Sequence, residues 1–364
     1  GLELTKYALQ NNHITEEQLV NIPETYFTES ILNFTPEQKT DIRKMMLLFP
    51  ILSAFPTLYL KRYIFDYLMD LNDSILSLAN KIFVGYRTSK LFKVNSLNGK
   101  PDLNFGDSGY VDLHKGLGEN SSSLYVSMTS PGVIYNNLII VGSRVSEGNP
   151  AAKGNIRAFD ANTGDLIWIF KTIPEIGEDG HETYDNPDAY HRLGGANAWA
   201  GLTLDEKRGI VYAPTGSVSY DFYGGDRVGD NLFANSIIAL DAENGKKIWH
   251  FQTVHHDVWD RDLPSPPVLF DYKINDSIIP SLAQVTKSGY IFILNRVTGK
   301  PLYDIIESPV PTNSLLIGEK LSETQPIPTF PDTFSRHSIS IQDINPFISN
   351  KEKDSIKKVF SSIL

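Results

Sequence analysis

The spacing of apolar and polar residues changes near residue 80. Before this point, "ITEEQLVNI" (14–22) and "FTPEQKTDIRKMM" (34–46) each place a threonine three positions ahead of a glutamine and then continue with apolar residues. This spacing is the capping-box signature of a helix start, and Pro36 stands at the favoured first helical position. We therefore predict a small α-helical segment over 1–80, to which the sequence assigns no role.

From residue 81 the pattern becomes one of short alternating strands separated by glycine turns. A repeat of strand, turn and second strand occurs as "LFKVNSLNGKPDL" (91–103), "IRAFDANTGDLIW" (156–168), "IIALDAENGKKIW" (237–249) and "IFILNRVTGKPLY" (291–303). The turn glycines are Gly99, Gly164, Gly245 and Gly299. Each is expected to supply the positive φ that a tight hairpin turn requires.

A large side chain follows each of these glycines by four positions: Leu103, Trp168, Trp249 and Tyr303. We expect these side chains to dock against a neighbouring unit. The repeats lie further apart than the about 40–50 residues of a bare four-stranded blade, so loops are inserted between them. Radial repetition of small antiparallel sheets predicts an all-β fold, a β-propeller over 81–345, followed by a helical tail over 346–364.

Composition and charge narrow the function classes. The net charge of -10 argues against nucleic acid as a partner, because nucleic acid requires a basic surface. The absence of cysteine excludes disulfides, thiolate metal sites and a cysteine nucleophile. The first residues, "GLELTKYALQ", lack the pattern of a secretion signal. The apolar tract 45–60 contains two prolines and is shorter than the roughly 18–20 residues of a membrane span.

One stretch, "TVHHDVWDRDLPSPP" (253–267), is dense in side chains that can carry chemistry. A metal site, an acid/base group and a solvated turn all fit its composition. His255 and His256 are adjacent, and adjacent residues on a strand point to opposite faces, so we interpret them as site-wall or structural residues rather than zinc ligands. Asp257 and Asp262 are expected to fix the loop by hydrogen bonds.

Three strings in a fixed order carry a family resemblance: "GGANAWAG" (194–201), the stretch 253–267 and "KSGYIFILNRVTGKP" (287–301). They resemble the pyrroloquinoline quinone (PQQ)-dependent dehydrogenases, in particular the membrane-bound glucose and quinate dehydrogenases. The strings "NFGDSGYVDLHKGLG" (104–118), "GSRVSEG" (142–148) and "SETQPIP" (322–328) fit the same branch. The resemblance covers 81–345.

The resemblance implies an eight-bladed propeller that holds PQQ and a divalent cation, Ca2+ or Mg2+, on its central axis. About four blade repeats are present. A half-propeller leaves two open sheet edges, which aggregate unless they are covered. We therefore expect either a piece of a longer product or a partner chain that completes the propeller.

The resemblance also implies roles for individual residues. Asp260 matches the catalytic base and a cation ligand, Lys287 matches the lysine that contacts the quinone oxygens, and Trp199 matches the tryptophan that stacks under the ring. Further cofactor contacts are implied for Asn197, Ser219 and Arg144. Glu147 corresponds to a carboxylate ligand of the cation. Ser217 stands where related alcohol dehydrogenases place an asparagine ligand, so the implied ligand shell is incomplete.

The implied activity is oxidation of a sugar, polyol or cyclic alcohol by hydride transfer to PQQ, with electrons passed to ubiquinone or a cytochrome. A periplasmic location, at the face of the inner membrane, is implied by the same resemblance. The alternative is a truncated, inactive propeller that serves as a binding or assembly module. The sequence does not name the substrate.

Overall fold

The computed structural model describes residues 81–86, 89–95, 99–118, 120–274, 276–337 and 340–363. The helices expected over 1–80, including the apolar tract 45–60, lie outside these residues. The chain divides into two compact units, and Ile82–Val94 with Pro101–Leu364 form the unit that holds almost all described residues. None of the described helices is long and apolar enough to cross a membrane.

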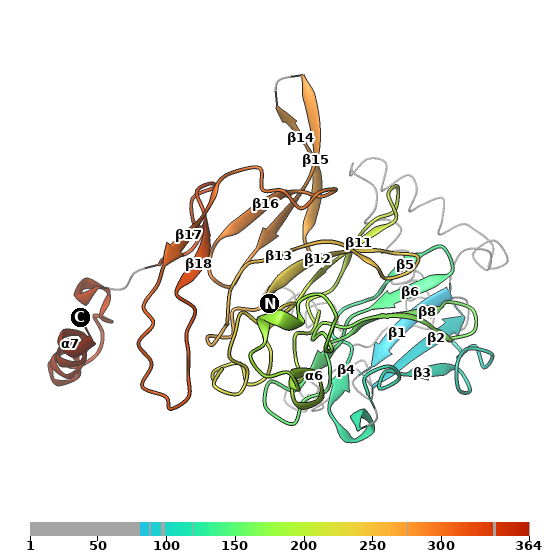
Figure 1. The fold of residues 1–364 in the computed structure, drawn as a ribbon, viewed down its shortest axis with the longest axis horizontal. Coiled ribbons are helices and arrows are strands. Elements are labelled where there is room, and N and C mark those ends of the chain that lie inside the picture. Colours follow the sequence, from blue (N-terminus) through green and yellow to red (C-terminus); the bar gives the residue numbers. More distant parts are fainter. Residues whose placement is uncertain are drawn as a thin grey trace, which may run out of the picture. The chain divides into compact units, whose positions relative to one another are not determined.

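Two complete four-stranded antiparallel sheets lie at the centre of this unit (Figure 1). The first sheet consists of β5 (Val133–Tyr135), β6 (Leu138–Val141), β8 (Ile156–Asp160) and β9 (Leu166–Phe170). The second consists of β10 (Thr203–Asp205), β11 (Ile210–Pro214), β12 (Ser236–Asp241) and β13 (Lys247–Gln252). Buried apolar side chains from both sheets form one continuous core: Ile140, Ile156, Ala158, Val211, Ile238 and Leu240.

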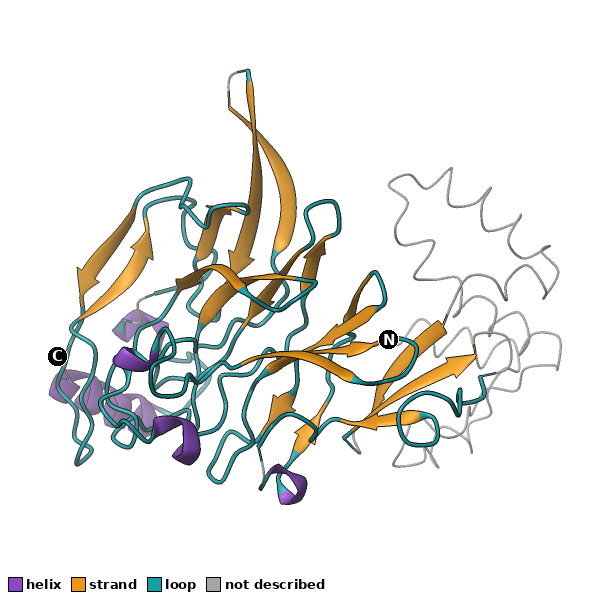
Figure 2. Ribbon diagram, turned by 45° about the vertical axis from the view of Figure 1, so that its right-hand side comes forward, coloured by secondary structure: helices purple, strands orange, loops and turns teal. Residues whose placement is uncertain are grey.

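Smaller sheets precede and follow these two. The three-stranded sheets are β1 (Lys81–Tyr86), β2 (Lys90–Asn95) and β3 (Tyr110–Asp112), and β14 (Val268–Ile274), β15 (Ser277–Val285) and β16 (Ile291–Asn295). The two-stranded sheets are β4 (Val126–Ser127) with β7 (Arg144–Val145), and β17 (Ile305–Pro309) with β18 (Thr324–Pro328). Helix is confined to α6 (Ala189–Arg192), α7 (Asn350–Ile363) and three short 3-10 turns in the described residues (Figure 2). The all-β prediction is confirmed, and the number of blades remains a prediction.

The four sequence repeats fold in two different ways. In 156–168 and 237–249 both predicted strands form, as β8–β9 and β12–β13. In 91–103 and 291–303 the chain returns after the turn only as a single bridge, at Pro101 and Pro301, so the prediction of a second strand is wrong there. Both of these turns read Gly-Lys-Pro. Proline has no N–H to donate to a ladder, which explains the difference.

Tryptophan docking between neighbouring sheets is confirmed. Trp168 donates its indole N–H to the carbonyl of Ala242 at 3.2 Å, and a Cβ added at Gly245 would lie only 2.5 Å from the Trp168 ring. Trp249 repeats this arrangement, with an N–H bond to Arg296 at 3.1 Å and its ring against Gly299. Gly245 and Gly299 therefore serve two purposes. They adopt the positive φ of the turn, 73° and 72° respectively, and they leave space for the neighbouring indole.

Leu103 does not dock, and the expectation that it would is wrong. Its side chain is 70% exposed, whereas Phe105, two residues later, is fully buried in the adjoining core. The N–H of Gly106 donates to the carbonyl of Thr163 in the next turn at 2.7 Å. Because Pro101 prevents a second strand, the chain turns earlier and presents Phe105 instead of Leu103 to the neighbouring sheet.

We predict that Trp168→Ala lowers the free energy of unfolding by about 3–5 kcal/mol, because it removes a buried indole and leaves a cavity between two sheets. Leu103→Ala is the matched control, since Leu103 occupies the same repeat position but is exposed, and it should change stability by no more than about 0.5 kcal/mol. Urea unfolding curves of both variants measure the effect. Equal midpoints for the two variants would contradict the docking role.

Candidate functional site

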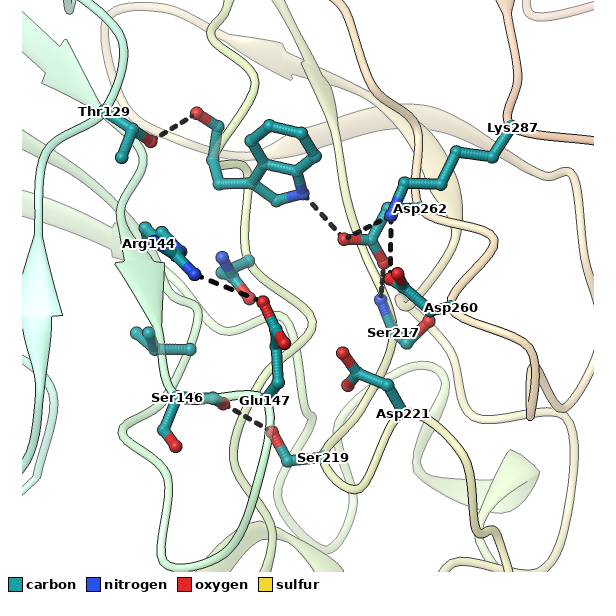
Figure 3. Close-up of a pocket in the computed structure, with 13 residues that line it drawn as sticks. Thr129, Arg144, Ser146, Glu147, Ser217, Ser219, Asp221, Asp260, Asp262 and Lys287 are labelled. Carbon is teal, nitrogen blue, oxygen red and sulfur yellow. Dashed lines mark hydrogen bonds and ion pairs between the residues drawn. The ribbon is translucent and has the colours of Figure 1, made fainter.

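A cavity of about 260 Å³ collects the side chains singled out in the sequence (Figure 3). All seven of these residues line it: Arg144, Glu147, Asn197, Trp199, Ser219, Asp260 and Lys287. The other lining residues are Thr129, Val145, Ser146, Ser217, Asp221 and Asp262. Except for Arg144 and Val145 in β7, they come from loops and turns that connect the strands. The structure thus brings the whole predicted set together, while the chemical role of each residue remains a proposal.

Trp199 lies at the cavity wall and is held at its edges. Its indole N–H donates to Asp262 at 2.7 Å, and its carbonyl accepts hydrogen bonds from the hydroxyls of Thr129 and Ser130, both at 2.8 Å. It lies outside the register of Trp168 and Trp249 and does not use their docking pattern. These contacts are made by the indole N–H and the backbone carbonyl, and the indole itself is a flat surface of the kind that packs on planar ligands.

Lys287 reaches the cavity from the turn between β15 and β16. Its ammonium donates to Asp260 at 2.7 Å, lies 3.8 Å from Asp262 and stands 5.7 Å from the centre of the Trp199 ring (Figure 3). Burial alone would lower the pKa of Lys287, but the hydrogen bond to Asp260 and the charges of Asp262 and Asp260 raise it. Lys287 is therefore a fixed cation between two carboxylates.

Asp260 has a left-handed backbone conformation, with φ of 53°. Aspartate tolerates this region better than most residues, and such conformations are concentrated at functional sites. The surrounding loop is fixed by Asp257, which accepts hydrogen bonds from the N–H groups of Trp259 and Arg261 at 2.9 and 2.6 Å. The predicted loop-fixing role of Asp257 is confirmed.

Asp262 also fixes the loop, as predicted, and in addition lines the cavity. It accepts the N–H of Ser217 at 2.7 Å and the indole N–H of Trp199 at 2.7 Å. Burial raises the pKa of Asp262, and the nearby charge of Lys287 opposes that shift. The carboxylate of Asp262 therefore contacts three other residues of the cavity: Ser217, Trp199 and Lys287.

Asp221 is the titratable residue of this cavity that the sequence does not predict. It is only 6% exposed, and among the described residues its carboxylate has no hydrogen-bond partner. Burial raises the pKa of Asp221 to about 8, with further contributions from Asp262, Asp260 and Glu147. No repeat or turn signature marks this position. The only local sign is that it lies in the long, mostly buried loop between β11 and β12.

The remaining predicted residues each make an ion pair or a hydrogen bond within the protein. Arg144 and Glu147 form a 3.3 Å ion pair that is largely exposed and therefore weak. Ser219 donates its hydroxyl to the carbonyl of Ser146 at 2.8 Å, so towards a ligand it can only accept. Asn197 donates its amide to Ser143 at 2.8 Å, which leaves the amide oxygen for a ligand.

The metal prediction receives no support from ligand spacing. In the described part of the chain no group of three or more histidines and carboxylates lies close enough to hold an ion. Asp260 is paired with Lys287, and Glu147 with Arg144. The donor chemistry of the cavity, rich in carboxylate and hydroxyl oxygens, nevertheless suits a hard divalent cation.

The two histidines of 253–267 contact different residues and do not line the cavity. His255 contacts Glu307 at 3.2 Å, whereas His256 contacts Glu319 at 2.9 Å and the carbonyl of Gly229 at 2.8 Å. The segment is a series of bends rather than the strand on which the prediction relied, and His256 has a positive φ. Their contacts are structural.

Comparison with known proteins shows which family this chain is similar to. A family model described as the glucose/ethanol/alcohol dehydrogenase β-propeller domain matches residues 67–363. The chain is 38% identical over 251 residues to the quinate/shikimate dehydrogenase (quinone) of Acinetobacter baylyi, covering 68% of this chain and 30% of that protein. It is 36% identical over 261 residues to quinoprotein glucose dehydrogenase A of Acinetobacter calcoaceticus, covering 68% and 31%.

Among solved structures, the quinohemoprotein alcohol dehydrogenase of Comamonas testosteroni superposes with a TM-score of 0.54 at 27% identity. The superposition covers 68% of this chain and 36% of that one. The chain therefore spans about a third of the length of the relatives that it matches.

We predict a pH-dependent stability that originates at Asp221. Between the ordinary aspartate pKa of 3.8 and the folded-state pKa of about 8, the folded protein binds more protons than the unfolded chain. Stability due to this group is therefore present at low pH and is lost as the pH rises towards 8. Asp221→Asn cannot ionise, so its melting temperature should exceed that of the wild type above pH 8, and the two should converge at low pH.

Thermal unfolding across this pH range, in the presence of a chelator, measures the difference. Asp226→Asn is the control, because Asp226 is exposed on the same loop and its removal changes the net charge equally. A gap between wild type and Asp221→Asn that does not grow with pH would contradict the assignment.

Proposed function

Because the chain belongs to the PQQ-dependent glucose, ethanol and alcohol dehydrogenase β-propeller family, we propose that it is a quinoprotein dehydrogenase for a sugar, polyol or cyclic alcohol. The observation that carries this proposal is the convergence of Trp199, Lys287 and Asp260 on one cavity. These three residues supply what oxidation of an alcohol on a quinone needs: a flat surface, a cation and a base.

The cavity fits PQQ in the chemistry of its walls. The indole of Trp199 offers a planar face, and the ammonium of Lys287 stands beside it, where it can contact quinone oxygens. The amide oxygen of Asn197, the hydroxyl of Ser219 and the guanidinium of Arg144 supply further polar contacts. PQQ, when bound, supplies the hydride acceptor, from which electrons pass to ubiquinone or a cytochrome.

Asp260 is assigned the role of general base. Its ion pair with Lys287 requires the carboxylate form, which is the form that can take the hydroxyl proton of the alcohol. Lys287 keeps its positive charge and stabilises negative charge that develops in its vicinity during the reaction. Trp199 and Asp262 hold the two groups in place through their 2.7 Å hydrogen bond and the contact of Asp262 with Lys287.

A divalent cation, Ca2+ or Mg2+, is part of the proposal, with Asp260 and Glu147 as its carboxylate ligands. Burial raises the pKa of Asp221, and the neighbouring carboxylates Asp262, Asp260 and Glu147 add to the shift; a bound cation would offset the charge of these carboxylates. The proposed setting is the periplasm or the periplasmic face of the inner membrane. The other function considered, an inactive binding or assembly propeller, gives no reason for Asp260, Lys287 and Trp199 to meet.

We predict that Asp260→Asn lowers dehydrogenase turnover by about a hundred- to ten-thousand-fold, the usual contribution of a general base. The protein is incubated with PQQ and Ca2+ or Mg2+, and reduction of a dye is followed with glucose, quinate or glycerol as substrate. Quenching of tryptophan fluorescence by PQQ reports cofactor binding separately, and it should persist in the variant because Trp199 and Lys287 remain.

Asp226→Asn serves as the control and should retain wild-type turnover, since Asp226 is exposed and lies outside the cavity. Absence of both fluorescence quenching and dye reduction in the wild-type chain would overturn the proposed function. Undiminished turnover in Asp260→Asn would overturn the assignment of the base.

A further inference from the structure

A second hollow of about 440 Å³ adjoins the cavity. It is lined by Glu147, Gly148, Tyr220, Asp221, Phe222 and Tyr223 and is named the aromatic groove below. Glu147 and Asp221 line both the groove and the cavity, so the two hollows adjoin at these carboxylates. A molecule bound in the groove therefore lies next to two residues that also line the proposed active site.

Along one loop segment, residues that line the cavity alternate with residues that line the aromatic groove. Ser219 and Asp221 are 2% and 6% exposed and line the cavity, whereas Tyr220 and Phe222, between and after them, are 42% and 62% exposed. Consecutive residues thus present polar groups to the cavity and aromatic rings to the groove. Exposed aromatic rings that lie together are uncommon on a protein surface unless they bind something.

Buried polar contacts hold this segment in place. The fully buried guanidinium of Arg227 donates to the carbonyl of Tyr220 at 2.9 Å. At the other end, Glu319 accepts the N–H of Gly224 at 2.8 Å and contacts the buried His256 at 2.9 Å. The hydroxyl of Tyr223 donates to the carbonyl of Ile317 at 2.9 Å. The aromatic groove is therefore preformed, and a ligand does not have to order it.

We propose that the aromatic groove is the subsite for the ring of the alcohol substrate, and that Phe222 and Tyr220 make the enzyme select ring-form over open-chain polyols. This inference rests on the proposed dehydrogenase function and names its substrate class. The C–H face of a ring polyol is apolar and can pack on an aromatic ring, whereas its hydroxyls lie at the edge of the ring. An open-chain polyol has no such continuous face.

The two carboxylates at the inner end of the groove agree with this occupant. Glu147 and Asp221 accept hydrogen bonds, and the hydroxyls of a polyol donate them. A purely apolar ligand would leave these two residues without hydrogen-bond partners. A ring that stacks on Phe222 and donates hydroxyls to Asp221 lies beside the cavity that contains Asp260.

The inference is tested by direct binding of sugars to the full chain, independently of turnover. Saturation-transfer NMR is recorded with D-glucose and myo-inositol as ring probes and D-sorbitol as the open-chain probe of the same carbon skeleton as glucose. We expect transfer to the C–H protons of at least one ring probe, weaker transfer to sorbitol, and loss of the ring signal in Phe222→Ala. Phe222→Tyr, which keeps the ring, should restore the signal.

Phe334→Ala is the matched control, because Phe334 is 58% exposed, similar to Phe222, but lies outside the groove. It should leave the signal unchanged. In the enzyme loaded with PQQ, Phe222→Ala should raise KM for the ring substrate about three- to tenfold, the usual value of an aromatic stacking contact, with little change in kcat or in KM for sorbitol.

The outcomes separate the two proposals. Equal ring-probe signals in wild type and Phe222→Ala, or the absence of any ring-probe signal in the wild type, overturn the assignment of the groove. A ring signal that depends on Phe222, combined with a chain that neither binds PQQ nor reduces dye, supports the groove and counts against the dehydrogenase.

Discussion

The buried carboxylate of Asp257 is the contact on which the site depends most. It is 3% exposed, and a carboxylate in that position is costly unless donors surround it. Four donors do so: the N–H groups of Trp259 and Arg261 in its own loop, and the side chains of Ser217 and Asn235 in the loop between β11 and β12. This arrangement ties two loops together and orients Asp260 outward, towards Lys287.

The loops can meet because the sheets beneath them are held side by side. Trp168 and Trp249 each bind the glycine turn of the following sheet, and the bond from the indole N–H to a backbone carbonyl fixes the orientation of the ring. Consecutive sheets therefore have a defined spacing, and loops from different sheets converge on one place. The three nearby aspartates have different roles. Asp257 and Asp262 hold the loops in place by hydrogen bonds, whereas Asp260 faces the cation Lys287.

The sequence predicted the parts of this fold that depend on local rules. The turn glycines all have positive φ, and Trp168 and Trp249 dock as their positions in the repeat indicated. The seven site residues were found through a resemblance, and the cavity contains them all. The repeat pattern overpredicts two second strands, because Pro101 and Pro301 have no N–H to donate to a ladder.

Asp221 escaped prediction for a different physical reason. Its pKa is raised by burial and further by Asp262 and Asp260 on another loop and Glu147 after β7, and no local pattern records such neighbours. Tyr220 and Phe222, on either side of Asp221, are likewise not marked by any local sequence pattern. Contacts between loops that are far apart in the sequence are specified by the way the sheets stack, which a single sequence does not reveal.

The charges of the cavity are distributed unevenly, and this distribution connects the site to the groove. Lys287 lies beside Asp260 and Asp262, so that side of the cavity is balanced. On the other side, Glu147 pairs with the exposed Arg144 and Asp221 interacts with the charge of the buried Arg227, and this side adjoins the aromatic groove. Two carboxylates that can accept hydrogen bonds thus line the same groove as the rings of Tyr220 and Phe222. A neutral molecule with many hydroxyls and one apolar face satisfies both requirements at once.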